Sequence, residues 1–212
     1  WPSDLAKKTT YTSASHLKPP SLLFAACFAW NGRLFLHGGK LIDRNISKNV
    51  WMLKPKTMQW KCVDVINHYQ QPMEWFGHTA TVLSSSSCLL VGENGCSILQ
   101  RYTTEQGQLC FAACAPHMPI AMHSTNTLQR THHTATRINN RIFLFGDHGK
   151  HCDGTLACYS YEESNNKSST TTVWLEDVLL KIQVNGQSPD PTLIRHGAVN
   201  LNGCLAIFGG II

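Results

Sequence analysis

The chain has 212 residues, of which 42% are hydrophobic and 15% charged, and its formal net charge is +5 at pH 7. This length is sufficient to bury a sizeable core. There is no apolar run of about 18 residues, so the sequence predicts no membrane-spanning segment. The net charge is only mildly positive, and the sequence contains no run of five or more Lys and Arg residues. The indication of nucleic-acid binding is therefore weak.

Residues 1–20 show no strand periodicity, and we expect a linker or the tail of a preceding element there. Residues 21–212 are organised as a repeat. Four apolar segments end in glycine, and their first glycines are 54, 54 and 63 residues apart: Gly38, Gly92, Gly146 and Gly209. The motif HTAT at 78–81 and 133–136, and RHGAV at 195–199, precedes the last three glycines by 14, 13 and 13 residues. A period near fifty residues built of short apolar strands predicts a propeller or a related array.

The first cycle predicts four strands between Phe24 and Val65. Asn31-Gly32 lies between two apolar segments and is the strongest short hairpin signal, because both residues tolerate positive φ. The predicted strands are FAACFAW, RLFLHGG, NVWMLKP and MQWKCVDV. Four strands in one cycle are the content of one propeller blade.

The later cycles repeat this order with weaker signals. The second contains HTATVL, CLLVG, SILQRYT and QLCFAACA, and the third contains HTATRI, RIFLFG, TLACYSYEE and VWLEDVLLKIQV, with a low-complexity loop over Ser164–Thr172. The segment VWLEDVLLKI also fits a helix, but its place in the cycle favours a strand. The fourth cycle holds two strands, AVNLNGCLAIFGG. The predicted connectors are Asn67–Trp75, Pro116–Arg130 and Asn185–Ile194.

These features resemble the kelch repeat, in which a Gly-Gly doublet closes the second strand and a tryptophan follows some twenty residues later. Gly38, Gly39 and Trp60 match that pattern, as does the doublet Gly209-Gly210. The second and third cycles depart from it, with Gly92-Glu93 and Gly146-Asp147 in place of the doublet. The resemblance implies an all-β kelch-type propeller of four-stranded blades, with about three and a half blades in residues 21–212 and hence an incomplete ring.

Kelch propellers serve as ubiquitin-ligase adaptors, as cytoskeletal and trafficking proteins, as enzyme appendages and, rarely, as oxidases. The wide spacing of the cycles and the polar loop in YSYEESNNKSS are also similar to the propeller of leucine carboxyl methyltransferase-like proteins of tRNA wybutosine synthesis. Two functions therefore stay open at this point. One is a protein-binding module, and the other is an appendage of a tRNA-modifying protein that assists RNA or partner binding.

Nine cysteines, an odd number without a CxxC pair, favour free thiols in a reducing compartment over a disulfide framework. We therefore expect a cytoplasmic protein, with the nucleus as the alternative. Two glycosylation sequons, at Asn45 and Asn166, keep a secreted protein open.

The sequence contains no recognisable catalytic motif, and we expect neither an enzyme nor a cofactor. His148, His151 and Cys152 are of the types that bind zinc or copper, but a fourth ligand and a spaced partner pair are missing. A polar loop without metal is therefore the preferred interpretation. His78, His133 and His196 recur once per cycle, which indicates hydrogen-bonding residues at strand entries.

The remaining candidates are basic loop residues. In a kelch ring the loops after the second strand and between blades gather on one face. That face would be basic and would bind an acidic protein segment or an RNA backbone, and a solvated face without a partner is the alternative. The candidates in the loops are Lys40, Arg44, His148, Lys150 and His151, and the connectors add His68, His117 and Arg130.

Overall fold

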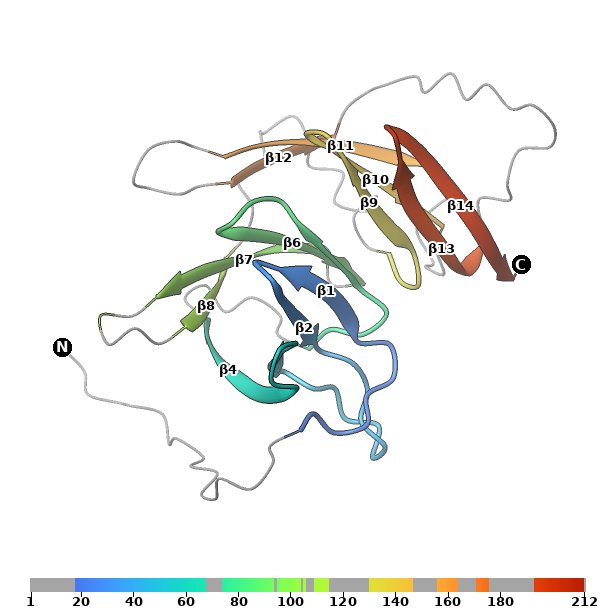
Figure 1. Cartoon of the computed structure of the whole chain (residues 1–212). Helices are drawn as coiled ribbons and strands as arrows, with labels where there is room; N and C mark the ends of the chain where they lie inside the picture. Colours follow the sequence, from blue (N-terminus) through green and yellow to red (C-terminus); the bar gives the residue numbers. More distant parts are fainter. Residues whose placement is uncertain are drawn as a thin grey trace.

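The structure is a computed structural model. It describes residues 18–67, 74–93, 95–103, 105, 109–114, 130–146, 156–163, 171–175 and 193–211. These residues form fourteen β-strands (Figure 1). No helix in the described part of the chain is long and apolar enough to cross a membrane. The predicted all-β class is confirmed for the described residues.

The first four strands follow the predicted cycle. They are β1 (Ala26–Trp30), β2 (Arg33–His37), β3 (Val50–Lys54) and β4 (Gln59–Asn67), each antiparallel to the next. The turn between β1 and β2 is made by Asn31 and Gly32, with φ of 47° and 69°. Buried and exposed residues alternate along β1, which is the pattern of a strand with one face in the core.

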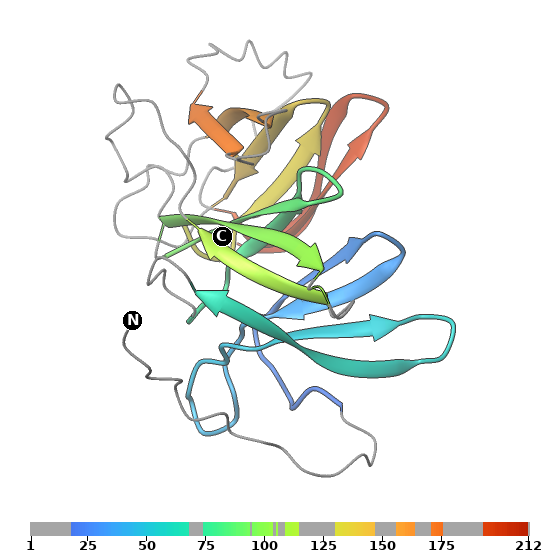
Figure 2. The same cartoon turned by 90° about the vertical axis from the view of Figure 1, so that its left-hand side faces the viewer.

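Two further groups repeat this order. The second consists of β5 (Thr79–Val82), β6 (Ser87–Gly92), β7 (Gly95–Thr103) and β8 (Leu109–Cys114). The third consists of β9 (Thr134–Ile138), β10 (Arg141–Phe145), β11 (Ala157–Glu163) and β12 (Thr171–Leu175). The last hairpin is β13 (Ile194–Leu201) and β14 (Cys204–Ile211). Figure 2 shows the first hairpins of the groups following one another in chain order, from blue through green and yellow to red.

The first two groups are joined into one eight-stranded sheet, of order β1-β2-β3-β4-β8-β7-β6-β5. The junction is a parallel pairing of β4 with β8, in which Asp64 lies opposite Cys110. The two end strands of this order, β1 and β5, contact each other, so the sheet is nearly closed and barrel-like (Figure 1). Separate four-stranded blades are therefore not what the structure shows for the first two groups, and no sequence pattern indicates the β4–β8 pairing.

Two segments differ locally from the sequence prediction. β12 begins at Thr171, inside the stretch predicted as a loop, because residues 171–175 pair with β11 from Glu163 to Tyr159. β13 begins at Ile194, inside a predicted connector, because Ile194 pairs with Ile211. The other predicted connectors lie largely outside the described residues, as do residues 1–17 of the expected linker.

The buried core lies between neighbouring groups. One cluster combines Phe28, Trp30 and Phe35 with Leu90 and Leu99 of the second group, among others. A second cluster combines Leu83 and Leu89 with Ile142, Leu144 and Tyr159 of the third group. The second group is thus stabilised by apolar burial against both the first and the third. The strand ends and loops that surround this packed core carry the candidate site.

Candidate binding face

Only part of the predicted basic face can be described. His148, Lys150 and His151, together with the connector residues His68 and His117, lie outside the described residues. The expected polar loop with Cys152 lies outside them as well. Among the described residues, no group of three or more His, Cys, Asp or Glu residues is placed to hold a metal ion. The described part of the face therefore consists of the residues around Lys40 and Arg44.

Arg130 does not belong to a solvent-facing basic surface, which corrects the sequence prediction. Its side chain is buried, and its guanidinium donates a hydrogen bond to the Gly146 carbonyl at 3.3 Å. Its backbone N–H also donates to the Gly92 carbonyl. A buried guanidinium needs such acceptors, because an unpaired buried charge is costly. Arg130 thus joins the ends of β6 and β10 instead of facing a partner.

Lys40 and Arg44 lie in the loop between β2 and β3, whose residues 40–49 are called here the 40–49 loop. A tight turn forms its tip, where the Leu41 N–H donates to the Asn45 carbonyl at 2.8 Å and the Arg44 N–H donates to the Leu41 carbonyl at 3.0 Å. The Asp43 carboxylate accepts from the Asn45 backbone and side chain, at 3.0 and 2.8 Å. Arg44 adopts a positive φ of 69° in this turn. These bonds fix the positions from which the charged side chains project.

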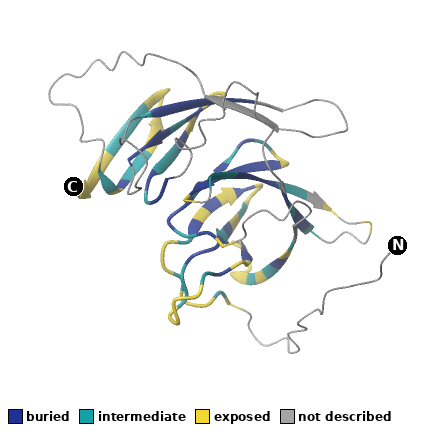
Figure 3. Ribbon diagram, turned by 180° about the vertical axis from the view of Figure 1, so that it is seen from behind, coloured by how far each residue is buried: buried dark blue, intermediate teal, exposed yellow. Residues whose placement is uncertain are grey.

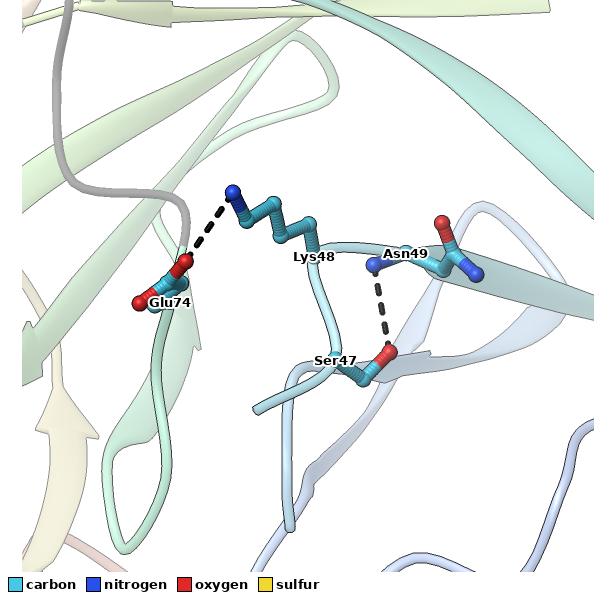
Figure 4. A network of polar contacts seen from close by, with 4 residues as sticks. All are labelled: Ser47, Lys48, Asn49 and Glu74. Carbon is cyan, nitrogen blue, oxygen red and sulfur yellow. Dashed lines mark hydrogen bonds and ion pairs between the residues drawn. The ribbon is translucent and has the colours of Figure 1, made fainter. Parts of the chain in front are cut away.

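The base of the loop is attached to the strands. The Ser47 N–H donates to the Gly39 carbonyl at 2.8 Å, and the Ser47 hydroxyl accepts from the Asn49 N–H at 3.2 Å. Lys48 extends from the loop toward Glu74, with Nζ and Oε1 2.9 Å apart (Figure 4). Both of these side chains are exposed, so the ion pair contributes at most about 1 kcal/mol to stability. The backbone bonds, and not the ion pair, hold the loop in place.

A second element of the face is the segment before β5. Lys40 Nζ lies 4.0 Å from the centre of the Phe76 ring, a cation–π contact. The Gly39 N–H donates to the Trp75 carbonyl at 2.7 Å. Gly38 is packed against the same carbonyl, since a Cβ on Gly38 would lie 2.3 Å from the Trp75 oxygen. The glycines that mark the repeat therefore allow two backbones to approach closely here.

The face also exposes apolar residues that the sequence patterns do not reveal. Ile42, at the tip of the 40–49 loop, is 88% exposed. Phe24, which follows the Leu23 that pairs with Lys40, is 43% exposed. Phe24 has a positive φ of 59°, and its ring makes an edge contact with His132. Composition alone cannot identify such residues, because an isoleucine in a loop is as compatible with a buried position as with an exposed one.

Trp75 is a structural residue, although the sequence prediction puts it in a connector. Its side chain is almost completely buried. It packs against Gly92, where a Cβ would lie 2.8 Å from the indole ring, and against the His78 ring. Trp60, the tryptophan that carries the kelch resemblance, lies in β4 and is only half-buried.

The recurring histidines form a series of contacts between groups. His133 Nε2 lies 2.9 Å from the Thr79 hydroxyl, and His196 Nε2 lies 2.8 Å from the Thr134 hydroxyl. His78 Nε2 is in the equivalent position but lies 2.9 Å from His37 Nδ1. Each histidine at a strand entry thus bonds to a polar side chain of the preceding group. We call these three contacts the histidine clamps.

Burial keeps the clamp histidines neutral. Desolvation lowers the pKa of His37 to about 4. It also lowers the pKa of His133 to about 3, with Arg130 and neighbouring histidines as further causes. The pKa of His78 is lowered by burial and by His37 and His133, and that of His196 is lowered by burial. Because a neutral imidazole has one donor and one acceptor nitrogen, each clamp can form without a charge. These histidines therefore add no positive charge to the face at neutral pH.

Two cysteines, the buried Cys88 and the partly buried Cys96, have the properties of core residues. All seven cysteines whose side chains can be described are free thiols. Burial raises the pKa of the Cys88 thiol, and it raises the pKa of the Cys96 thiol to about 12. A thiol of that kind is protonated at neutral pH and behaves as a small apolar side chain.

Comparison with known proteins does not assign this chain to a family. No family model matches this chain, and no curated protein matches it. The indications of function are therefore the geometry of the face and the kelch resemblance of the repeat.

Proposed function

We propose that this chain is a portion of a kelch-type β-propeller that acts as a non-catalytic protein-binding module. The propeller interpretation is supported by three antiparallel groups of four strands and a fourth hairpin, whose inner strands contact one another in the order β1, β5, β9, β13. It is also supported by glycine and histidine positions that recur at equivalent places in the groups. The parallel β4–β8 pairing is a departure from that arrangement.

The observation that carries the binding proposal is the 40–49 loop itself. It combines an almost fully exposed Ile42 with the cationic side chains of Lys40 and Arg44 on a backbone fixed by hydrogen bonds, while the third cation, Lys48, is paired with Glu74. Loops held on a rigid scaffold are common recognition elements. The partner that fits this loop is a protein segment with acidic residues around an apolar side chain.

The binding site can be located by photo-crosslinking. A photoreactive phenylalanine analogue placed at Ile42 should become covalently attached to the partner. The matched control is the same analogue at Met58, which is 71% exposed but lies in the β3–β4 turn at the opposite end of the strands. Crosslinking of one protein from Met58, and none from Ile42, would place the site on the other face.

The purified partner then allows an affinity measurement. Lys40→Glu/Arg44→Glu should weaken binding by at least about tenfold, because charges on the loop would then repel an acidic segment. Lys54→Glu/Lys56→Glu, at the opposite end, should leave affinity unchanged. Equal affinities for wild type and the Lys40/Arg44 variant would contradict the proposal. A crosslink from Ile42 that yields RNA, and that ribonuclease removes, would instead favour the tRNA-processing appendage.

A further inference from the structure

The first hairpins of successive groups pack face to face, and the first two of these junctions use the same two faces. Residues directly opposite each other in a hairpin share a face, so Cys27 and Leu36 lie on one face of β1–β2, and Phe28 and Phe35 lie on the other. We call the first the leading face and the second the trailing face, and we use the same terms for the equivalent positions of the other hairpins.

At the first junction, the trailing face of β1–β2 packs on the leading face of β5–β6. Phe28, Trp30 and Phe35 are buried in one cluster with Cys88 and Leu90, and Ala80 and Val82 pack against that cluster. At the next junction, Leu83 and Leu89 are buried with Ile142 and Leu144, and Ala135 packs against them. At both of these junctions, neighbouring hairpins therefore associate by apolar burial of a trailing face against a leading face.

The last hairpin leaves its trailing face uncovered. Val199, Leu201 and Phe208 are 40%, 58% and 60% exposed, whereas the equivalent residues of the first hairpin, Phe28, Trp30 and His37, are buried. Figure 3 shows the contrast, with much of β13–β14 in yellow and teal beside the darker hairpins of the preceding groups. Three neighbouring apolar side chains on one sheet face form a surface that favours association.

The first hairpin leaves the complementary leading face uncovered. Cys27 and Ala29 are exposed, and Leu34 is 37% exposed. In the second group the equivalent residues are Ala80, Val82 and Cys88, which pack in the cluster of the first junction. One chain therefore carries, at its two ends, the two halves of the junction that it also forms internally.

The histidine clamps support a match between these two ends. At the internal junctions, a threonine or His37 meets the histidine that opens the next hairpin. The last hairpin has Gly197 at the threonine position, with the Phe208 ring against it, so it offers no polar partner there. The first hairpin has Ala25 at the position of the clamp histidine, and an alanine side chain requires no polar partner. At the clamp position, a junction between these ends would therefore bury no unpaired imidazole, whereas a histidine in place of Ala25 would be buried there without a partner.

We propose that this chain self-associates head to tail, with the trailing face of β13–β14 in one copy covering the leading face of β1–β2 in a second copy. The contact is heterologous, since it joins two different surfaces. It reproduces the internal junctions with apolar side chains and without a histidine clamp.

The test uses the 212-residue chain in sedimentation velocity over a wide concentration range. The wild type should form a dimer or a larger species as its concentration rises. Leu201→Lys on the trailing face and Ala29→Asp on the leading face should each weaken association by at least about tenfold, because a charge would be buried without a partner. Mixing the two variants should restore association. In a mixed pair, one junction joins the Lys-bearing trailing face to the Asp-bearing leading face, and the other junction joins two wild-type faces. Met58→Lys, on neither face, is the matched control and should associate like the wild type.

Hydrogen exchange gives an independent measurement that needs no variant. Amides of β13 and β14 in the wild type should become more protected as the concentration rises, and those of β7 should not change. A wild type that stays monomeric throughout, or variants that associate like the wild type, would overturn the proposal. The first of these results would mean that another segment or another protein covers these faces.

Discussion

At the entries of β5, β9 and β13, a side chain that usually titrates near neutral pH is used as a neutral hydrogen-bonding group. His78, His133 and His196 reach back to the preceding group, where they meet His37, Thr79 and Thr134, respectively. The Nδ1 atoms of His78 and His133 are buried and have no hydrogen-bond partner among the described residues. A proton added at such a position would be a buried charge, so acid should act on the fold through these residues.

The free energy of unfolding should therefore fall as the pH drops below about 6.5. In the unfolded chain, histidine binds a proton near its ordinary pKa of about 6.5, whereas the folded pKa is about 4 for His37 and about 3 for His133. Between these values the unfolded state binds more protons, so stability decreases with falling pH. At pH 5 the loss should be on the order of 2 kcal/mol for each of these two residues. Urea unfolding at pH 7, 6 and 5 measures it, and equal midpoints would show that these histidines are not buried.

Sequence reasoning identified the recurring residues but not all of their partners. The spacing of HTAT indicates a structural histidine at each strand entry, and a periodic pattern carries that information. The contact of His78 with His37 has no such signal, because His37 occurs in only one cycle. The burial of Trp75 was likewise unpredictable, since its position inside a predicted connector gave it no periodicity.

Among the elements, the first hairpin differs from the next two in the cross-strand pair that supplies the polar partner of the clamp. Ala26 and His37 are opposite each other in β1–β2, where β5–β6 has Thr79 and Val91 and β9–β10 has Thr134 and Phe145. The polar member of the pair has thus moved from the first strand to the second. The clamp to the following histidine is retained, because directly opposite side chains lie on the same face.

This interpretation predicts the outcome of a double substitution. His37→Val alone should destabilise the chain by about 1–3 kcal/mol, because His78 Nε2 would lose its buried partner. Adding Ala26→Thr should recover most of that loss by recreating the pair found in the second hairpin. Ala26→Thr by itself should not stabilise the protein, since His37 already fills the site. Urea unfolding of the four proteins at pH 7 measures the coupling between the two positions.

The double variant also provides a control for the acid sensitivity. It lacks His37, whose pKa is lowered to about 4, so its stability should depend less steeply on pH between 7 and 5 than that of the wild type. An unchanged slope, or a double variant as unstable as His37→Val, would contradict the equivalence of the two pairs.

Short-range signals made some elements predictable and left others undetected. The β1–β2 hairpin could be predicted because Asn31-Gly32 specifies its turn, independently of the rest of the fold. The start of β12 could not be predicted, because its first two residues are threonines at the end of a low-complexity stretch. They form a strand through pairing with Glu162 and Glu163 of β11, which is a tertiary effect.

At the scale of the whole molecule, the repeat predicted the order of the groups but not how the first two are joined. The repeated glycines and histidines lie in or directly beside the first two strands of each cycle and carry no information about the outer strands. The parallel pairing of residues 64–67 with residues 110–113 connects those outer strands. It replaces two unpaired sheet edges by one ladder, which removes backbone groups that could otherwise pair with another chain.

This pairing can be tested with a single new cysteine. Asp64 lies directly opposite Cys110 across the β4–β8 ladder, and neighbouring strands are about 4.8 Å apart, within the range of Cα separations that a disulfide spans. Asp64→Cys should therefore form a disulfide with Cys110 under mild oxidation, detected by peptide mapping. Lys61→Cys is the control, because Lys61 is exposed in the same strand but lies opposite Met52 of β3. If the thiol introduced by Asp64→Cys stays reduced while the protein is folded, the outer strands are not paired, and the first two groups are separate blades of the kind that the kelch resemblance implies.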